Sequence, residues 1–272
     1  MRINKSFSLV LGSLFVGLLL VIMIINLFYT PYGENVMSIT ERLQAPGSAH
    51  WLGTDNFGRD VLSRIMVGAQ TAFLVGSISV AIGLTCGFIV GTLAGYVGGW
   101  VDELLMRATD ALLAFPGILL ALLLVSIFKP NMFQTIIAIG VLSVPAFARV
   151  IRSGVLQHRE ADYVRAARGI GAGHFNVIFI QILPNIISSI ITTAALSFST
   201  AILVEAALSY LGLGVQPPDP SWGRMLNEAQ GYLNKAPWYA LAPGLLITLS
   251  VLGFNLLGDG IRDLRDNVNR GG

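Results

Sequence analysis

The sequence predicts an all-α membrane protein with six transmembrane helices, and two observations support this prediction. Charged residues make up only 12% of the 272 residues and 54% are hydrophobic, whereas about 25% of the residues in a soluble domain are charged. The chain also contains long windows without a charged residue or histidine, at residues 6–33, 65–101, 111–128, 130–148, 175–204 and 236–258. Because a helix needs about 20 mostly apolar residues to cross a bilayer core, each window is near or above the length of one span.

The first window predicts an N-terminal transmembrane helix within residues 1–30, with Phe7–Tyr29 as its apolar part. A secretory signal peptide has an apolar core of about 7 to 15 residues. The window is longer than that, so we expect an uncleaved span that lies beside the other five helices.

Residues 31–67 predict an extracytoplasmic loop with a short helix. Turn-forming residues recur along this segment, at Pro31, Pro46, Gly47, Gly53 and Gly58. Such residues indicate irregular structure. We expect a short amphipathic helix near Asp60–Val67 before the second span begins.

Residues 68–272 predict a core of five helices, and the second span carries a stripe of small residues on one face. The stripe consists of glycines one helical turn apart, at Gly83, Gly87, Gly91 and Gly95. Small residues let two membrane helices approach closely. The stripe indicates helix packing, either within the subunit or as a contact or gate between subunits.

Basic residues predict the orientation of the spans. Of the 17 Lys and Arg residues, 11 fall on one side of a six-span topology, and the rest fall in the opposite loops, at Arg42, Arg59, Arg64, Lys129, Arg224 and Lys235. Because cytoplasmic loops are richer in Lys and Arg, we expect both termini in the cytoplasm. The net charge of +2 is too small and too dispersed for a nucleic-acid surface.

The segment 156–184 is the most charged part of the chain and predicts a cytoplasmic helix, turn and second helix. Its loop includes EADYVRAARGIGAGHFNVIFIQILPN at residues 160–185, which begins with Glu160 and Ala161. Gly169, Gly171 and Gly173 interrupt the helical pattern. A protein partner could dock on the small side chains of the first helix and move the adjoining spans, although a merely solvated loop is the alternative.

This segment resembles the conserved cytoplasmic loop of ABC-importer permeases. The family pattern is Glu-Ala-Ala, three residues, Gly, nine residues, an aliphatic residue, one more residue, and Leu-Pro. The positions that match it are Ala166, Ala167, Gly171, Leu183 and Pro184. Arg165 replaces the family's Glu, and Gln181 replaces the aliphatic residue. The resemblance implies that this segment couples the permease to a partner ATPase, although Arg165 could not make the ion pair of a Glu.

Further blocks resemble the C-type permeases of dipeptide, oligopeptide and nickel ABC importers. They are GTDNFGRDVLSR (53–64), GGWVDELLMRATDALLAFPG (98–117), LSYLGLGVQPPDPSWGRML (208–226) and FNLLGDGIRDLRD (254–266). The resemblance implies a type I ABC-importer permease in the inner or plasma membrane of a prokaryote. It implies as partners a second homologous permease, two ATP-binding subunits and an extracytoplasmic solute-binding protein. Di- or oligopeptides are the expected cargo, with nickel or a metal chelate such as a metallophore as the alternative.

The chain is not expected to be an enzyme or to hold a cofactor. A phosphate-binding Walker A loop needs Gly-Lys-Ser/Thr, but the lysines follow Asn4, Phe128 and Asn234. ATP and Mg²⁺ are therefore expected in the partner ATPases. The scattered histidines, without an HExxH motif, predict no metal site.

Two further sites involve charged residues in or near the spans. Glu205 lies at the end of the fifth apolar window, where an acidic residue lines a pathway or makes a structural hydrogen bond. Arg107 and Asp110 have the i, i+3 spacing of a local ion pair. A stand-alone secondary transporter is the hypothesis from another class, and Glu205 is its only support.

Overall fold

The computed structural model of the chain describes residues 5–268, so the outer ends of the predicted segments 1–30 and 68–272 lie outside the described residues. Helices account for its regular structure, apart from one isolated β-bridge between Thr54 and Asp60. In chain order the elements are α1 (Lys5–Phe28), η1 (Ile39–Glu41), α2 (Val61–Val97), α3 (Gly99–Leu113), α4 (Gly117–Ile127), α5 (Met132–His158), α6 (Asp162–Gly169), α7 (His174–Asn176), η2 (Val177–Ile182), α8 (Leu183–Tyr210), α9 (Trp222–Ala229), η3 (Gln230–Tyr232) and α10 (Pro237–Val268). The predicted all-α fold is confirmed.

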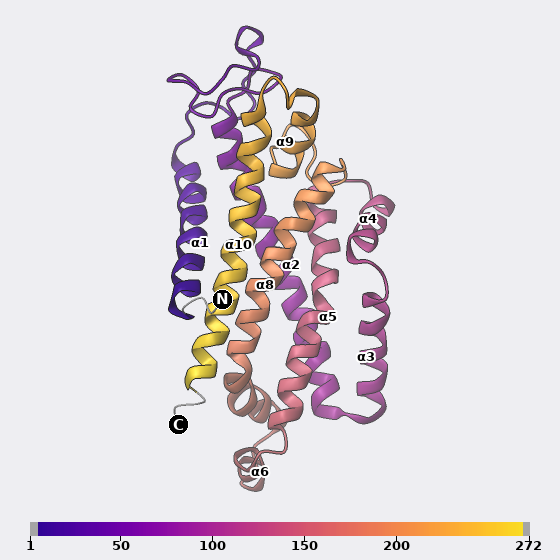
Figure 1. The fold of residues 1–272 in the computed structure, drawn as a ribbon. Helices are drawn as coiled ribbons and strands as arrows, with labels where there is room; N and C mark the ends of the chain where they lie inside the picture. The colour runs from indigo at the N-terminus through magenta and orange to yellow at the C-terminus, as the bar shows by residue number, and fades with distance from the viewer. Residues whose placement is uncertain (1–4, 269–272) are drawn as a thin grey trace.

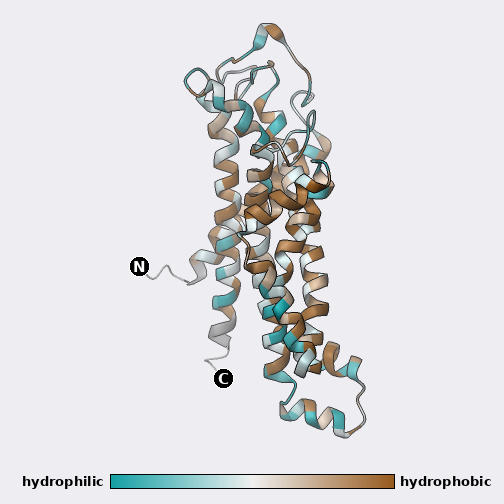
Figure 2. Cartoon of the chain, turned by 90° about the vertical axis from the view of Figure 1, so that its right-hand side faces the viewer, coloured by the Kyte–Doolittle hydropathy of each residue, from teal (hydrophilic) through white to brown (hydrophobic). Residues whose placement is uncertain are grey.

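The long helices form an elongated bundle whose middle is hydrophobic and whose ends are more polar (Figures 1 and 2). Within residues 5–268, five helices are long and apolar enough to cross a membrane: Phe7–Phe28, Val61–Val97, Met132–His158, His174–Tyr210 and Pro237–Leu264. The third predicted span is instead a bent pair, α3 and α4, with an angle of 89° between them. Pro116 lies at the bend, where its missing N–H and its ring disfavour a continuous helix.

The short helix expected near Asp60–Val67 is not a separate element. Asp60 is the N-cap of α2, and its carboxylate accepts a hydrogen bond of 2.7 Å from the backbone N of Ser63. An N-cap Asp satisfies a free N–H of the first helical turn. Helix α2 therefore begins at Val61, and the predicted boundary between residues 67 and 68 falls inside it.

The glycine stripe of α2 packs against α5 of the same chain. A Cβ added at Gly83 would lie 2.5 Å from the Cβ of Ser143, and one added at Gly87 would lie 2.5 Å from the Cβ of Phe147. Farther along, the equivalent distances are 2.5 Å from Gly91 to the carbonyl oxygen of Ala148 and 2.9 Å from Gly95 to the Cβ of Val155. The two helices are therefore close enough that only glycine fits along the stripe.

Helix α1 lies on the outside of the bundle along α10 (Figure 1). A Cβ at Gly12 of α1 would lie 2.5 Å from the backbone N of Leu257, and one at Gly260 of α10 would lie 2.8 Å from the Cα of Leu9. Much of the remaining α1 surface is apolar and exposed, for example at Leu14 and Ile24. Such a surface suits contact with lipid tails.

Candidate functional site

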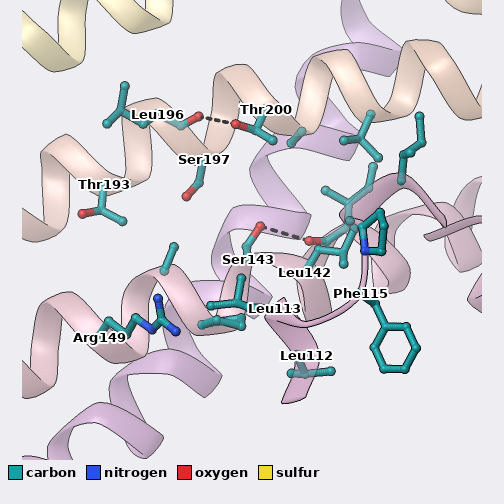
Figure 3. A pocket seen from close by; sticks show the side chains of 18 of the residues that line it. Leu112, Leu113, Phe115, Leu142, Ser143, Arg149, Thr193, Leu196, Ser197 and Thr200 are labelled. Carbon is teal, nitrogen blue, oxygen red and sulfur yellow. Dashed lines mark hydrogen bonds between the residues drawn. The ribbon is translucent and has the colours of Figure 1, made fainter. Parts of the chain in front are cut away.

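A cavity of about 920 Å³ opens between α5, α8 and the bend that joins α3 to α4 (Figure 3). The bend contributes Leu112 to Ile118 apart from Ala114, α5 contributes residues between Ile139 and Val150, and α8 contributes residues between Thr193 and Val204. The side chains that line it are mostly apolar, with serine and threonine hydroxyls among them. The cavity therefore lies along one face of each of two membrane helices.

A second cavity of about 550 Å³ continues the first toward the end of the bundle that carries α6. The two cavities share Arg149, Val150, Thr193 and Leu196. The second is also lined by Ser153, Gln157, Ser188 and Thr192. We call the combined lining of the two cavities the groove.

Several hydroxyl groups of the groove donate hydrogen bonds to backbone carbonyls of their own helices. Thr193 donates to the carbonyl of Ser189 at 2.8 Å, Thr200 to that of Leu196 at 3.0 Å, and Ser143 to that of Ile139 at 3.0 Å. Figure 3 shows two of these bonds within the cavity. Because a hydroxyl that has donated its proton still has lone pairs, these three hydroxyls offer a solute hydrogen-bond acceptors.

Among the described residues, Arg149 and Arg262 are the charged members of the groove lining. The ion pair that Arg149 makes shows that the predicted pair between Arg107 and Asp110 is wrong. Asp110 does not pair with Arg107, because its Oδ1 lies 2.6 Å from Nη2 of Arg149 on α5. Arg107 pairs instead with Glu103, one helical turn away, at 2.6 Å. In the sequence, Arg149 counted only as one of the 11 basic residues of the predicted cytoplasmic side. The spacing of groove-facing residues on α5 was the signal that could have identified it.

Glu205 does not line the groove. Its side chain is buried on α8, and Ser209 donates a hydrogen bond of 2.7 Å to its Oε1. The Ser209 hydroxyl in turn accepts from the backbone N of Val215 at 3.0 Å. The carboxylate therefore helps to fix the chain that follows α8.

The segment predicted to couple the chain to an ATPase protrudes from one end of the bundle as α6 (Figure 1). Glu160, Arg165 and Ala166 are exposed, and Ala161, at the N-cap, is partly buried. Ala167 is buried, with 9% of its surface exposed. Gly171 has a φ of +90° and open space around it, a conformation that favours glycine. Ala166 and Gly171 are thus accessible, whereas Ala167 holds α6 on the bundle.

The second helix of this segment is longer than predicted, because α7, η2 and α8 form one span from His174 to Tyr210. Leu183 and Pro184 open α8, and the preceding turns at Val177–Ile182 are π-helical. Proline cannot donate the hydrogen bond that a regular helix needs at its position, and π-helical turns are rare and occur mostly as short bulges within α-helices. The motif's Leu-Pro therefore lies at a change of helix geometry.

Polar contacts connect α6 and α7 to the ends of the spans. Tyr163 of α6 is hydrogen-bonded through Oη to Nδ1 of His158 at 2.8 Å, and burial raises the pKa of Tyr163. Tyr96 at the end of α2 is bonded through Oη to Nδ1 of His174 at 2.7 Å. The guanidinium of Arg168 lies 5.3 Å from the Tyr96 ring centroid. A displacement of α6 would therefore also displace the ends of α2 and α5.

A buried charge cluster at the other end of the bundle joins the segment 53–64 to α9 and α10. We call Asp55, Arg59, Arg64, Glu228 and Tyr239 the loop charge cluster. Arg59 contacts Asp55 at 2.5 Å and Glu228 at 2.8 Å, and the Tyr239 hydroxyl donates to Glu228 at 2.8 Å. Sequence reasoning missed it, because its members lie far apart in the chain.

Within the loop charge cluster, the pKa values of Glu228 and Arg59 shift in opposite directions, each toward the charged form. Burial by itself would raise the pKa of Glu228, but the Tyr239 hydrogen bond and the charges of Arg59 and Arg64 outweigh it and lower that pKa. Burial opposes the charge of Arg59, yet Asp55 and Glu228 outweigh it and raise the pKa of Arg59. Both groups are therefore charged at neutral pH, and they hold the long loop against the helices.

Comparison with known proteins gives a consistent result. The family described as "Binding-protein-dependent transport system inner membrane component" matches residues 87–267. The glutathione transport system permease protein GsiD of Pectobacterium atrosepticum is 44% identical over 97% of this chain and 88% of that protein. The dipeptide transport system permease protein DppC of Alkalihalophilus pseudofirmus is 42% identical over 97% of this chain and 87% of that protein.

The fold also has a counterpart among solved structures. An inward-facing structure of the MetNI methionine ABC transporter aligns with 75% of this chain and 95% of its own, with a TM-score of 0.58 and 16% sequence identity. At this level of identity the likeness concerns the fold alone. The arrangement of helices in this chain therefore resembles that of the aligned MetNI chain.

Proposed function

The chain belongs to the family of inner-membrane components of binding-protein-dependent transport systems, and from this premise we propose that it forms half of the translocation path of an ATP-driven importer for di- and oligopeptides. Relatives named for glutathione and dipeptide transport support peptide cargo. The chain is a multi-pass membrane transport subunit, and its described residues contain five continuous candidate spans and one bent pair.

One observation supports the proposal most directly: α6 is connected to the same helices that line the groove. The groove runs along α5 and α8, and α6 is joined to the end of α5 through Tyr163 and His158. The helix that begins at His174 and continues as α8 is joined to α2 through Tyr96. A partner that shifts α6 would thus tilt the two helices that line the path and change the end at which it is open.

We propose that the open side of the groove faces a second, homologous permease. The larger cavity is enclosed by α5, α8 and the bend between α3 and α4, and the bent pair beside it exposes apolar side chains such as Phe115, Leu119 and Leu123. Two ATP-binding subunits, which hold ATP and Mg²⁺, dock on the coupling segment through Glu160, Ala161 and the matching motif positions. An extracytoplasmic solute-binding protein delivers the cargo, in keeping with the family description.

We propose that both termini and α6 are cytoplasmic. Within the described residues, α1 begins and α10 ends toward the end of the bundle that carries α6 (Figure 1). The excess of Lys and Arg on that side supports the orientation. Of the six basic residues at the other end, Arg59 and Arg64 belong to the loop charge cluster, and Arg224 pairs with Glu228.

Nickel or a metal chelate remains the alternative cargo. Among the described residues no group of three or more His, Cys, Asp or Glu side chains could hold a metal ion. If the cargo is a metal, we expect the solute-binding protein or a chelator to bind it, and this chain to provide only the path. The stand-alone secondary transporter is not favoured, because the family depends on a binding protein.

Reconstitution of the complete importer tests this function. The tagged chain is purified with its partners, placed in proteoliposomes with the binding protein, and supplied with a labelled dipeptide or with ⁶³Ni²⁺. We expect dipeptide uptake that requires ATP, and co-purification of a second permease and ATPases. Uptake by the chain alone without ATP, or uptake of nickel and no peptide, would overturn the proposal.

A further inference from the structure

Arg149 occupies an unusual position for an arginine. It lies nine residues before the end of α5 at His158, which at about 1.5 Å per residue places it roughly 13 Å inside the bundle from that end. Charged residues on membrane helices usually face the bundle interior or a cavity and often mark a substrate pathway. Its side chain is 53% exposed and lies within the groove.

The guanidinium of Arg149 has N–H donors available to bind a ligand in the cavity. Figure 3 shows it extending between Thr193 of α8 and Leu113 at the bend. The structure gives it one hydrogen bond within residues 5–268, from Nη2 to Oδ1 of Asp110. Because a guanidinium carries five N–H groups, donors remain for a second carboxylate.

Arg152 on the same helix shows what a purely structural arginine looks like here. It binds Asp102 of α3 through two parallel hydrogen bonds of 2.5 and 2.6 Å, and it does not line the groove. Both arginines connect α5 to α3, but only Arg149 of the two faces the cavity. Arg152 is therefore a matched control.

The rest of the groove is complementary to the other parts of a peptide. The hydroxyls of Ser143, Thr193 and Thr200 donate to backbone carbonyls and can accept from N–H groups of a peptide. Within residues 5–268 no carboxylate is among its lining side chains, so a cationic side chain finds no counter-charge there. A side-chain carboxylate of a peptide, in contrast, finds a charged donor at Arg149, which lines both cavities, whereas Arg262 lines the second cavity alone.

On the basis of the proposed function, we propose that Arg149 binds the side-chain carboxylate of a passing acidic peptide and makes the path selective for acidic over basic peptides. When the path is empty, Asp110 occupies one edge of the guanidinium and holds it at the groove. An entering carboxylate takes the free edge, with the bidentate geometry that arginine favours. Arg149 is thus a specificity-determining residue of the path.

The test measures ATP-dependent initial uptake rates of three matched dipeptides, Ala-Glu, Ala-Gln and Ala-Lys, by the complete importer in proteoliposomes with saturating binding protein. Each variant's rate is divided by the wild-type rate for the same peptide, which removes the selectivity of the binding protein. We expect Arg149→Gln to lower the ratio of Ala-Glu to Ala-Lys uptake about tenfold, the size expected for a charged hydrogen bond. Arg149→Lys, which keeps the charge, should lose less.

One further variant separates binding from structure. Arg152→Gln breaks the neighbouring ion pair between α5 and α3 and should keep the wild-type ratio. An unchanged ratio in Arg149→Gln, or an equal loss of the ratio in Arg152→Gln, would overturn the inference. Absence of ATP-dependent uptake of all three peptides by the wild type would overturn the proposed function itself.

Discussion

At the scale of single residues, the stability of the long loop depends on the loop charge cluster. Glu228 accepts from Tyr239 and contacts Arg59, and its side chain is only 13% exposed. Two arginines lie within 4 Å of it from the segment 53–64 and α2. Removing one partner of a buried ion pair leaves an uncompensated charge, which is far more costly than the loss of an exposed pair.

We therefore expect Glu228→Gln to destabilise the purified chain by about 3 kcal/mol. The matched control is Glu103→Gln, because the Glu103–Arg107 pair is exposed and should be worth less than about 1 kcal/mol. Thermal unfolding in detergent measures both. Equal melting temperatures for Glu228→Gln and the wild type would show that the cluster does not hold the loop.

The same carboxylate predicts a pH dependence. The folded-state pKa of Glu228 lies below its ordinary value of 4.5, so its stabilising contribution is complete above that value and is lost as the pH falls through the lower folded-state pKa. We expect the melting temperature of the wild type to fall more steeply below pH 4.5 than that of Glu228→Gln. Parallel pH profiles of the two proteins would contradict this assignment.

Local motifs could be recognised in the sequence, whereas contacts between distant residues could not. Ala166, Ala167 and Gly171 were named because they match the loop pattern of ABC-importer permeases, and Gly171 adopts a positive φ. The loop charge cluster could not, because Arg59 and Glu228 are 169 positions apart. Arg149 was missed since its significance depends on which face of α5 borders α8.

At the scale of the helices, α6 is the part that a partner can reach. Ala166 is exposed on this helix. We expect Ala166→Trp to leave the melting temperature within about 1 °C, because exposed substitutions usually have small effects, yet to abolish ATP-dependent uptake by blocking the docked ATPase. Co-purification of the ATPases reports the docking directly.

Ala45→Trp is the control for this variant, because Ala45 is also exposed but lies in the loop at the opposite end of the bundle. It should transport normally. Normal uptake and normal ATPase recovery by Ala166→Trp would remove α6 from the coupling path.

The packing of α2 on α5 gives a second prediction at this scale. Gly87→Ala adds a Cβ 2.5 Å from that of Phe147, so we expect a loss of about 1–3 kcal/mol from overpacking. Gly17→Ala on α1 meets nothing within 4 Å and should be neutral or slightly stabilising, because alanine favours a helix. Thermal unfolding of the two variants side by side makes the comparison, and equal stability would mean that the stripe is not tightly packed.

Apolar windows predicted the positions of the helices well and their shapes less well. The window 111–128 contains Pro116, yet its length alone suggested a straight span where the chain bends by 89°. The helix expected near Asp60–Val67 is continuous with α2. The length of a charge-free window indicates how hydrophobic a segment is. Where a helix bends or begins depends instead on capping residues and on tertiary contacts.

At the scale of the whole molecule, the account makes the groove a path for solute that opens and closes with α6. The chain has one cysteine, Cys86, which is exposed on α2 but lines neither cavity. Ser197 of α8 lines the groove (Figure 3). The two positions therefore distinguish a water-filled path from a surface in contact with lipid.

The most direct measurement is the rate at which a water-soluble, membrane-impermeant thiol reagent modifies the Ser197→Cys variant in a Cys86→Ser background, within the complete importer. The account predicts that modification of the thiol introduced at position 197 changes severalfold between the nucleotide-free and ATP-bound states, while Cys86 of the wild type stays unmodified in both. If the introduced thiol resists the reagent in both states while peptide uptake continues, the path lies elsewhere and the account is contradicted.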